Sequence, residues 1–128
     1  MIKVNIQEKN QHILIFSTTY LPVTGGLQYL LYWLAEEFDL LLDQDKYSMT
    51  TVSFMVPSIQ HDVVQFDNIK FYEYGCKSSG IFNKLKIIFK LFQIIKKNQV
   101  NLLSCWDLIS DGPIASIASK ISGIPFVV

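Results

Sequence analysis

The segment "ILIFSTTYLPVTGGLQYLLYWLAEEF" (residues 13–38) decides the fold of this chain. It starts within a continuous apolar run, residues 12–16, which is typical of a strand buried on both faces of a sheet. After Gly25 and Gly26, apolar residues recur at three- and four-residue steps from Leu27 to Leu41, and this period predicts an amphipathic helix. A buried strand that passes through a glycine turn into a helix is the first half of a parallel βαβ unit.

The rest of the chain repeats the same alternation of strands and helices. Ser110 or Asp111 is expected to cap the last helix, Pro113 suits its first turn and Gly123 ends it. The pattern predicts an α/β fold, a Rossmann-like doubly wound and mostly parallel sheet with helices on both faces. The chain stops at Val128 inside an expected strand, so we expect a truncated domain. The further strands are expected at 49–56, 69–74, 100–105 and from 124, and the further helices at 81–98 and about 111–122.

Composition narrows the class of protein. The chain has 128 residues, half of them hydrophobic, which suits one domain with a buried core. Eleven lysines balance eleven acidic residues and there is no arginine, so no nucleic-acid partner is expected. Cys76 and Cys105 show no metal-ligand spacing, and we expect neither a metal nor a cofactor. No apolar run is long enough to span a bilayer and no secretory signal precedes the first strand, which favours a cytoplasmic protein.

The glycine pair lies where ligands bind in open parallel sheets, beyond the carboxyl ends of the strands at the point where strand order reverses. Gly25 and Gly26 follow the first strand, and Trp106 and Asp107 follow the fourth. In a doubly wound order these two strands are neighbours, so both loops are expected to line one crevice. The glycines are either a plain tight turn or a place where a phosphate or sugar reaches backbone N–H groups. Neither the dinucleotide fingerprint nor a P-loop is present.

Residues 13–38, together with "VNLLSCWDLISDGPIASIASKISGIPFVV" (residues 100–128), resemble the N-terminal domain of GT-B glycosyltransferases of the family-4 type. In that family the first strand is followed by a proline, a Gly-Gly pair and a helix ending in Leu-Ala and acidic residues. A later strand, an Ala-rich helix and Gly-Ile-Pro-Phe-Val-Val follow in the same order. This chain departs from the family at Ser104, Cys105 and Trp106, where His-Ala-His is common, and His12 and His61 match no family position.

The resemblance implies that residues 1–128 are part of the acceptor-side domain, and that the donor-binding C-terminal domain is absent. Such enzymes move a sugar from a nucleotide-diphosphate sugar to a glycan or lipid-linked acceptor, as in polysaccharide biosynthesis. Carried over, Gly25 and Gly26 lie near the donor phosphates, and Asp107 faces the acceptor. No catalytic residue is assigned, and we do not expect the chain to catalyse alone. Two alternatives stay open: a subunit of a split glycosyltransferase, and a non-catalytic Rossmann-like binding module.

Several other residues admit two interpretations each. Tyr20 precedes the glycine loop and is either core packing or a platform for sugar stacking. Asp107 either forms a hydrogen bond within its own loop or binds the acceptor. Asp111 is expected to be a helix cap, and Cys105 is expected to pack as a small buried hydrophobic residue. The helix from Phe82 to Lys97 is apolar around most of its circumference. It is either wedged between the sheet and a neighbour or rests on the inner face of a membrane, with its lysines meeting anionic headgroups.

Overall fold

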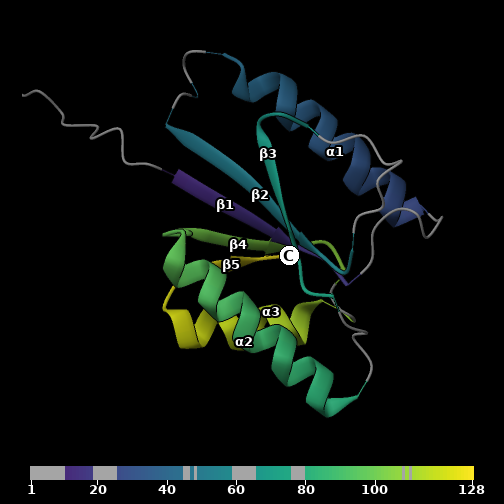
Figure 1. Ribbon diagram of the computed structural model, residues 1–128, viewed down its shortest axis with the longest axis vertical. Coiled ribbons are helices and arrows are strands. Elements are labelled where there is room, and N and C mark those ends of the chain that lie inside the picture. The colour runs from purple at the N-terminus through teal and green to yellow at the C-terminus, as the bar shows by residue number, and fades with distance from the viewer. Residues whose placement is uncertain are drawn as a thin grey trace, which may run out of the picture.

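The computed structural model describes residues 11–18, 26–44, 47, 49–58, 66–75, 80–107, 109 and 111–128, the side chains of 26–28 excepted. In these residues strands and helices alternate along the chain (Figure 1). The predicted α/β alternation is confirmed. The elements are β1 (Gln11–Phe16), α1 (Gly26–Leu42), β2 (Thr50–Val56), β3 (Ile69–Glu73), α2 (Ile81–Lys97), β4 (Leu102–Cys105), α3 (Gly112–Ser122) and β5 (Phe126–Val127).

The strands form one sheet in the order β3-β2-β1-β4-β5, and every pairing is parallel. The chain runs outward from β1 to β3 and then returns to place β4 on the other side of β1. Strand order therefore reverses between β1 and β4, as the Rossmann-like prediction requires.

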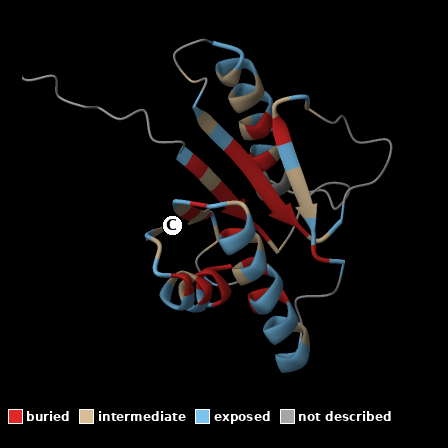
Figure 2. Cartoon of the chain, turned by 60° about the vertical axis from the view of Figure 1, so that its left-hand side comes forward, coloured by how far each residue is buried: buried red, intermediate tan, exposed pale blue. Residues whose placement is uncertain are grey.

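Helices cover both faces of the sheet, with α1 on one side and α2 and α3 on the other (Figure 1). Alternate residues of β1 supply both cores, because successive side chains of a strand point to opposite faces. Leu14 and Phe16 pack in the cluster shared with α2 and α3, whereas Ile15 packs in the cluster shared with α1. Strands β1 and β2 are accordingly red along most of their length in Figure 2, whereas the edge strand β3 is red only at its start and the outer sides of the helices are pale blue.

The end of α3 is set by a glycine. Gly123 has a φ of 73°, a left-handed conformation that residues with a Cβ adopt at a cost. Its N–H donates to the Ser119 carbonyl at 2.8 Å and closes the last turn. The chain then turns into β5, so the prediction that Gly123 ends this helix is confirmed.

The sheet also separates the charges of a neutral chain. Helix α1 contains Glu36, Glu37 and Asp39 and no lysine. Helix α2 contains five lysines and α3 contains Lys120, and neither has an Asp or Glu. The helix on one face of the sheet is therefore acidic and the two helices on the opposite face are basic, although the formal net charge of the chain is zero.

Candidate functional site

The carboxyl ends of β1 and β4 lie side by side. Phe16 is the register partner of Cys105 in the parallel pairing of these strands. Thr18 and Trp106 follow β1 and β4 in the sequence and lie at the same edge of the sheet. The prediction that the first and fourth strands are neighbours is confirmed. Helix α1 begins at Gly26, so the second glycine of the pair is the first residue of the helix. Tyr20 and Gly25 lie outside the described residues, and their binding roles stay predictions.

A buried carboxylate joins the two loops at this edge. Asp111 stands directly before α3 and is fully buried. Its Oδ1 accepts a hydrogen bond from the Thr18 backbone N–H at 2.9 Å and another from the Thr18 hydroxyl at 2.7 Å. These bonds connect residues 93 positions apart in the sequence. The segment leaving β1 is thus tied to the segment entering α3.

The prediction that Ser110 or Asp111 caps α3 is confirmed for the position of Asp111 but not for its side chain, and Ser110 lies outside the described residues. Asp111 occupies the N-cap position, but its carboxylate makes no capping hydrogen bond. The Asp107 carbonyl instead accepts the N–H groups of Asp111 and Gly112, at 2.9 and 3.1 Å. An N-cap side chain contributes about 1 kcal/mol, and each of the two hydrogen bonds from Thr18 contributes roughly 0.5–1.5 kcal/mol, so that the pair together exceeds a cap. The tertiary contact with Thr18 therefore outweighs the local cap.

The environment of this edge favours neutral side chains. Burial raises the pKa of the Asp111 carboxyl above its usual range and the Asp107 charge acts in the same direction, while the hydrogen bonds from Thr18 oppose the rise. Burial, followed by the charges of Asp111 and Asp107, raises the pKa of the Cys105 thiol to about 11. Cys105 is therefore a protonated, buried thiol, which agrees with the prediction that it packs as a small hydrophobe.

Asp107 and Trp106 are placed differently within the same loop. The Asp107 Oδ1 accepts the Ile109 N–H at 3.0 Å, which is the loop hydrogen bond that one of its two interpretations predicts. The Trp106 side chain is 44% exposed. A large, partly exposed indole next to the switch point is suited to stacking against a sugar ring. Among the described residues, no group of three His, Cys, Asp or Glu side chains is placed to hold a metal ion.

Sequence reasoning did not single out Thr18. The neighbouring Ser17 is held from two sides, because its N–H donates to the Met55 carbonyl at 3.0 Å and its own carbonyl accepts the Tyr74 hydroxyl at 3.3 Å. Thr18 then bonds Asp111, so the chain leaving β1 is fixed up to this residue. A usable signal exists in the sequence: a hydroxyl residue follows the first strand and an acid follows the fourth, in loops that a doubly wound order brings together.

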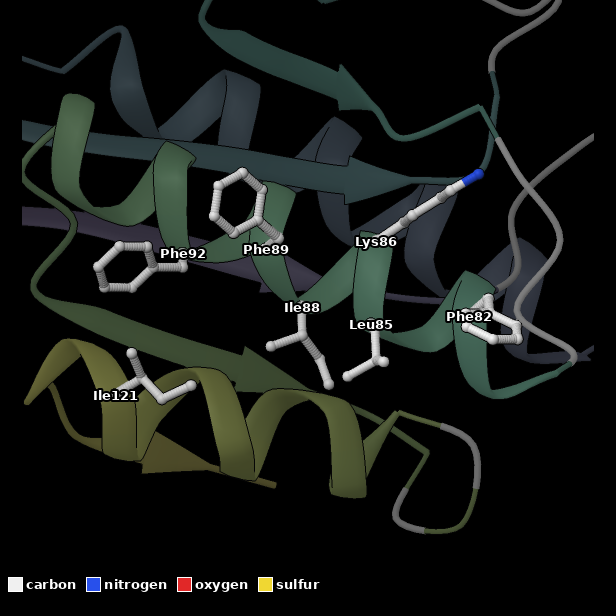
Figure 3. Close-up of a pocket in the computed structure, with 7 residues that line it drawn as sticks. All are labelled: Phe82, Leu85, Lys86, Ile88, Phe89, Phe92 and Ile121. Carbon is white, nitrogen blue, oxygen red and sulfur yellow. The ribbon is translucent and has the colours of Figure 1, made fainter.

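Helix α2 leaves an apolar surface exposed. It packs on the sheet through Ile87, Leu91 and Ile95 and lies against α3, as the wedged interpretation predicts. Yet Phe82 is 79% exposed and Phe89 62% exposed. Between α2 and α3 an open apolar groove of about 660 Å³ follows this side of the helix (Figure 3). Its lining residues are Phe82, Leu85, Lys86, Ile88, Phe89, Phe92 and Ile121.

The fold and the reversal of strand order define the chain as a Rossmann-like domain with its candidate crevice at the switch point. Comparison with solved structures finds a similar fold in two GT-B glycosyltransferases. MurG of Acinetobacter baumannii superposes with a TM-score of 0.61 and 19% identity, over 91% of this chain and 33% of that one. The lipopolysaccharide outer core galactosyltransferase WaaB gives a TM-score of 0.55 and 18% identity, over 91% of this chain and 32% of WaaB.

The similarity is one of fold. The C-terminal domain of a hydrogenase from Pyrococcus furiosus also superposes, with a TM-score of 0.51 and 14% identity over 92% of this chain and 90% of that domain. No family model and no curated protein matches the sequence. The chain spans about a third of the length of the two glycosyltransferases. It therefore has a Rossmann-like fold that part of each of these two enzymes also has.

Proposed function

We propose that this chain is the acceptor-side half of a glycosyltransferase. The observation that carries the proposal is the meeting of β1 and β4 at a switch point, with the glycine loop after one strand and Trp106 and Asp107 after the other. The superposition on MurG and WaaB over most of this chain supports it. In this role the domain presents an acceptor, a glycan or lipid-linked glycan, to a nucleotide-diphosphate sugar held mainly by a second domain.

The proposed division of labour follows from the residues at the sheet edge. The first turn of α1, opened by Gly26, contains no acidic residue, so its N–H groups are suited to the charge of a donor phosphate. Such preorganised N–H groups stabilise charge that develops on a departing diphosphate. Asp107 would orient an acceptor hydroxyl and Trp106 would stack on an acceptor sugar. Asp111 and Cys105 are buried, and we give them no contact with substrate.

A transfer assay tests this proposal. The chain is combined with a donor-binding GT-B domain and labelled nucleotide sugars, and incorporation of label into lipid-linked glycan is measured. We expect transfer only in the combined sample. Asp107→Asn should lower its rate roughly 10- to 100-fold, the range of a positioned polar group. Asp67→Asn, an exposed acid outside the crevice, is the matched control and should leave transfer unchanged.

The alternative class, a non-catalytic binding module, makes a different prediction in the same assay. It predicts binding of a glycan or glycolipid, weakened by Trp106→Ala, with no transfer in any pairing. A stable complex with a donor-domain protein that does transfer sugar would identify a split enzyme. Binding without transfer would contradict the glycosyltransferase proposal.

We further propose that the α2–α3 side rests on the inner face of a membrane, which presents a lipid-linked acceptor to the crevice. Within the described part of the chain, no helix is both long and apolar enough to cross a bilayer. The apolar groove in Figure 3 is bordered by a helix with five lysines and no acid, which suits an anionic surface. The cytoplasmic location of the chain is part of this proposal.

Vesicle sedimentation tests the membrane contact. We expect the chain to pellet with anionic vesicles at low salt and to be released at high salt. Phe82→Ser with Phe89→Ser should abolish pelleting, because both side chains are exposed on α2. Trp33→Ser with Leu40→Ser removes exposed apolar side chains from α1, on the opposite face, and should not. Equal loss in both double variants, or no pelleting of the unmodified chain, would refute the contact.

A further inference from the structure

A second hollow lies on the other flank of α2, between this helix and β3. It has a volume of about 280 Å³ and is distinct from the apolar groove, since the two share no lining residue. Strand β3, which forms one wall of the hollow, is an edge strand of the sheet. The residues around it are Lys70, Tyr72, Lys90, Gln93, Ile94, Lys97 and Asn98.

Three of these lining residues are lysines and none is acidic. Lys70 comes from β3, where its ammonium lies 5.0 Å from the centre of the Tyr72 ring. Lys90 and Lys97 come from α2, two turns apart on one side of the helix. The acidic residue of β3, Glu73, is out of phase with Lys70 and Tyr72 and belongs to the opposite face of the strand. Three lysines and no acidic residue therefore line one hollow.

The Lys90 side chain is held in place. Its Nζ donates a hydrogen bond to the Tyr74 carbonyl at 3.2 Å, and this bond fixes the position of one of the lysines that line the hollow. An ammonium has three N–H donors, so this bond leaves Lys90 with further donor capacity. Gln93 adds an amide between Lys90 and Lys97. Neighbouring hollows that share these residues extend the basic lining to Lys86 and Lys96.

An anion in the hollow would be attracted by the ammonium groups of all three lysines that line it. Lysines act on phosphate as point charges, and a phosphate group has enough charge and acceptor oxygens to engage several at once. The hollow holds several times the roughly 30 Å³ that a water molecule occupies. A phosphate group therefore fits both its charge and its size.

We propose that the hollow between β3 and α2 is a phosphate-binding site, with Lys70, Lys90 and Lys97 as its cationic ligands. The phosphate belongs either to a lipid headgroup or to a free phosphate or pyrophosphate. The site goes beyond the proposed sugar transfer and does not depend on it. It lies against the outer edge of the sheet at β3, whereas the candidate crevice lies at the β1–β4 switch point.

The test compares two double variants with the same change in charge. Lys70→Gln with Lys97→Gln removes two ligands of the proposed site. Lys84→Gln with Lys120→Gln removes two lysines of α2 and α3 that border none of the hollows described above. All four side chains are exposed, so the stability of the fold should change little, and urea unfolding checks this. Lys90 is left intact because it also bonds the backbone of Tyr74.

Pyrophosphate is titrated into the isotope-labelled chain, and amide shifts are followed by NMR. We expect shifts centred on Tyr72, Gln93 and Lys97, and an affinity lowered roughly tenfold or more in the first double variant. The second double variant should bind as the unmodified chain does. Equal weakening in both variants would mean that the general positive field binds the anion, and it would overturn the proposed site. So would the absence of binding to pyrophosphate and to vesicles alike.

A second arm separates the two sources of phosphate. Vesicles of phosphatidylcholine with and without phosphatidylglycerol are added to each variant. A headgroup site is identified if the chain binds the charged vesicles, if this binding depends on Lys70 and Lys97, and if pyrophosphate competes with it. Pyrophosphate binding that vesicles do not compete identifies a free-phosphate site. Sugar transfer is measured separately, so its failure would leave this result unaffected.

Discussion

Replacing Asp111 tests whether the tie to Thr18 holds the sheet edge together. Asp111→Ala removes the acceptor of two hydrogen bonds and leaves the Thr18 N–H without this partner in a partly buried position. An unsatisfied buried donor costs about 1–3 kcal/mol. Removal of a buried carboxylate offsets part of that cost, because the desolvation of the charge disappears with it. We expect a loss of about 2 kcal/mol in the free energy of unfolding.

Asp111→Asn is the informative companion, because its amide oxygen can still accept both hydrogen bonds from Thr18. It should cost less than about 1 kcal/mol, the typical net value of one hydrogen bond. Urea unfolding followed by circular dichroism gives both free energies, and an unchanged m-value confirms that the folded state is comparable. Thr18→Val removes only the hydroxyl donor and should fall between the two.

The pH dependence gives an independent check. The pKa of Asp111 in the folded chain is raised above 3.8, so the folded state binds this proton more tightly than the unfolded chain. The stability contributed by protonated Asp111 is fully present below pH 3.8 and is lost as the pH rises through the raised pKa. Asp111→Asn lacks this loss, so it should gain on the unmodified chain as the pH rises from 3.8 through the raised pKa of Asp111. The reasoning fails if Asn costs as much as Ala, or if the unmodified chain gains on Asp111→Asn over that range.

Three further outcomes are expected. In a Cys76→Ser background, Cys105 of the folded chain should resist thiol alkylation at pH 8, because the thiol is buried and its pKa is raised to about 11. It should react once the chain is unfolded in urea. Fast reaction of the folded chain would contradict this expectation. Leu91→Ala should lower the free energy of unfolding in urea by about 2–5 kcal/mol, since the Leu91 side chain is fully buried. Phe89→Ala should lower it by less than about 1 kcal/mol, because the Phe89 side chain is 62% exposed. Gly123→Ala should lower the free energy of unfolding by about 1 kcal/mol, because the left-handed φ of 73° disfavours a Cβ. No atom lies within 4 Å of the added carbon. A much larger loss would therefore mean that backbone strain is not its cause.

The order of elements was predictable from local patterns. Continuous apolar runs marked β1 and β4, and a three- to four-residue period marked α1, because burial imposes these periods directly on the sequence. Gly123 marked the end of α3 because few other residues adopt its backbone conformation. The neighbouring positions of β1 and β4 followed from the doubly wound topology.

Long-range side-chain partners were not predictable in the same way. Asp111 has the local features of a helix cap, and only the approach of Thr18 from β1 redirects its carboxylate. The lysines of α2 form a polar stripe in the sequence, but the pattern of one helix does not show what faces that stripe. Lys70 lies opposite it because of where β3 stands at the edge of the sheet. Such contacts depend on packing between distant segments.

The acidic helix on one face of the sheet and the basic helices on the other form two opposite poles in a chain whose formal net charge is zero. Near a charged surface, an uncharged particle with two opposite poles experiences little net pull but a definite torque. Within roughly one Debye length, about 8–10 Å at physiological salt, that torque turns the lysine-rich pole towards negative charge. Orientation would thus precede adhesion, and added salt should randomise the approach of the chain before it alters any contact within the fold.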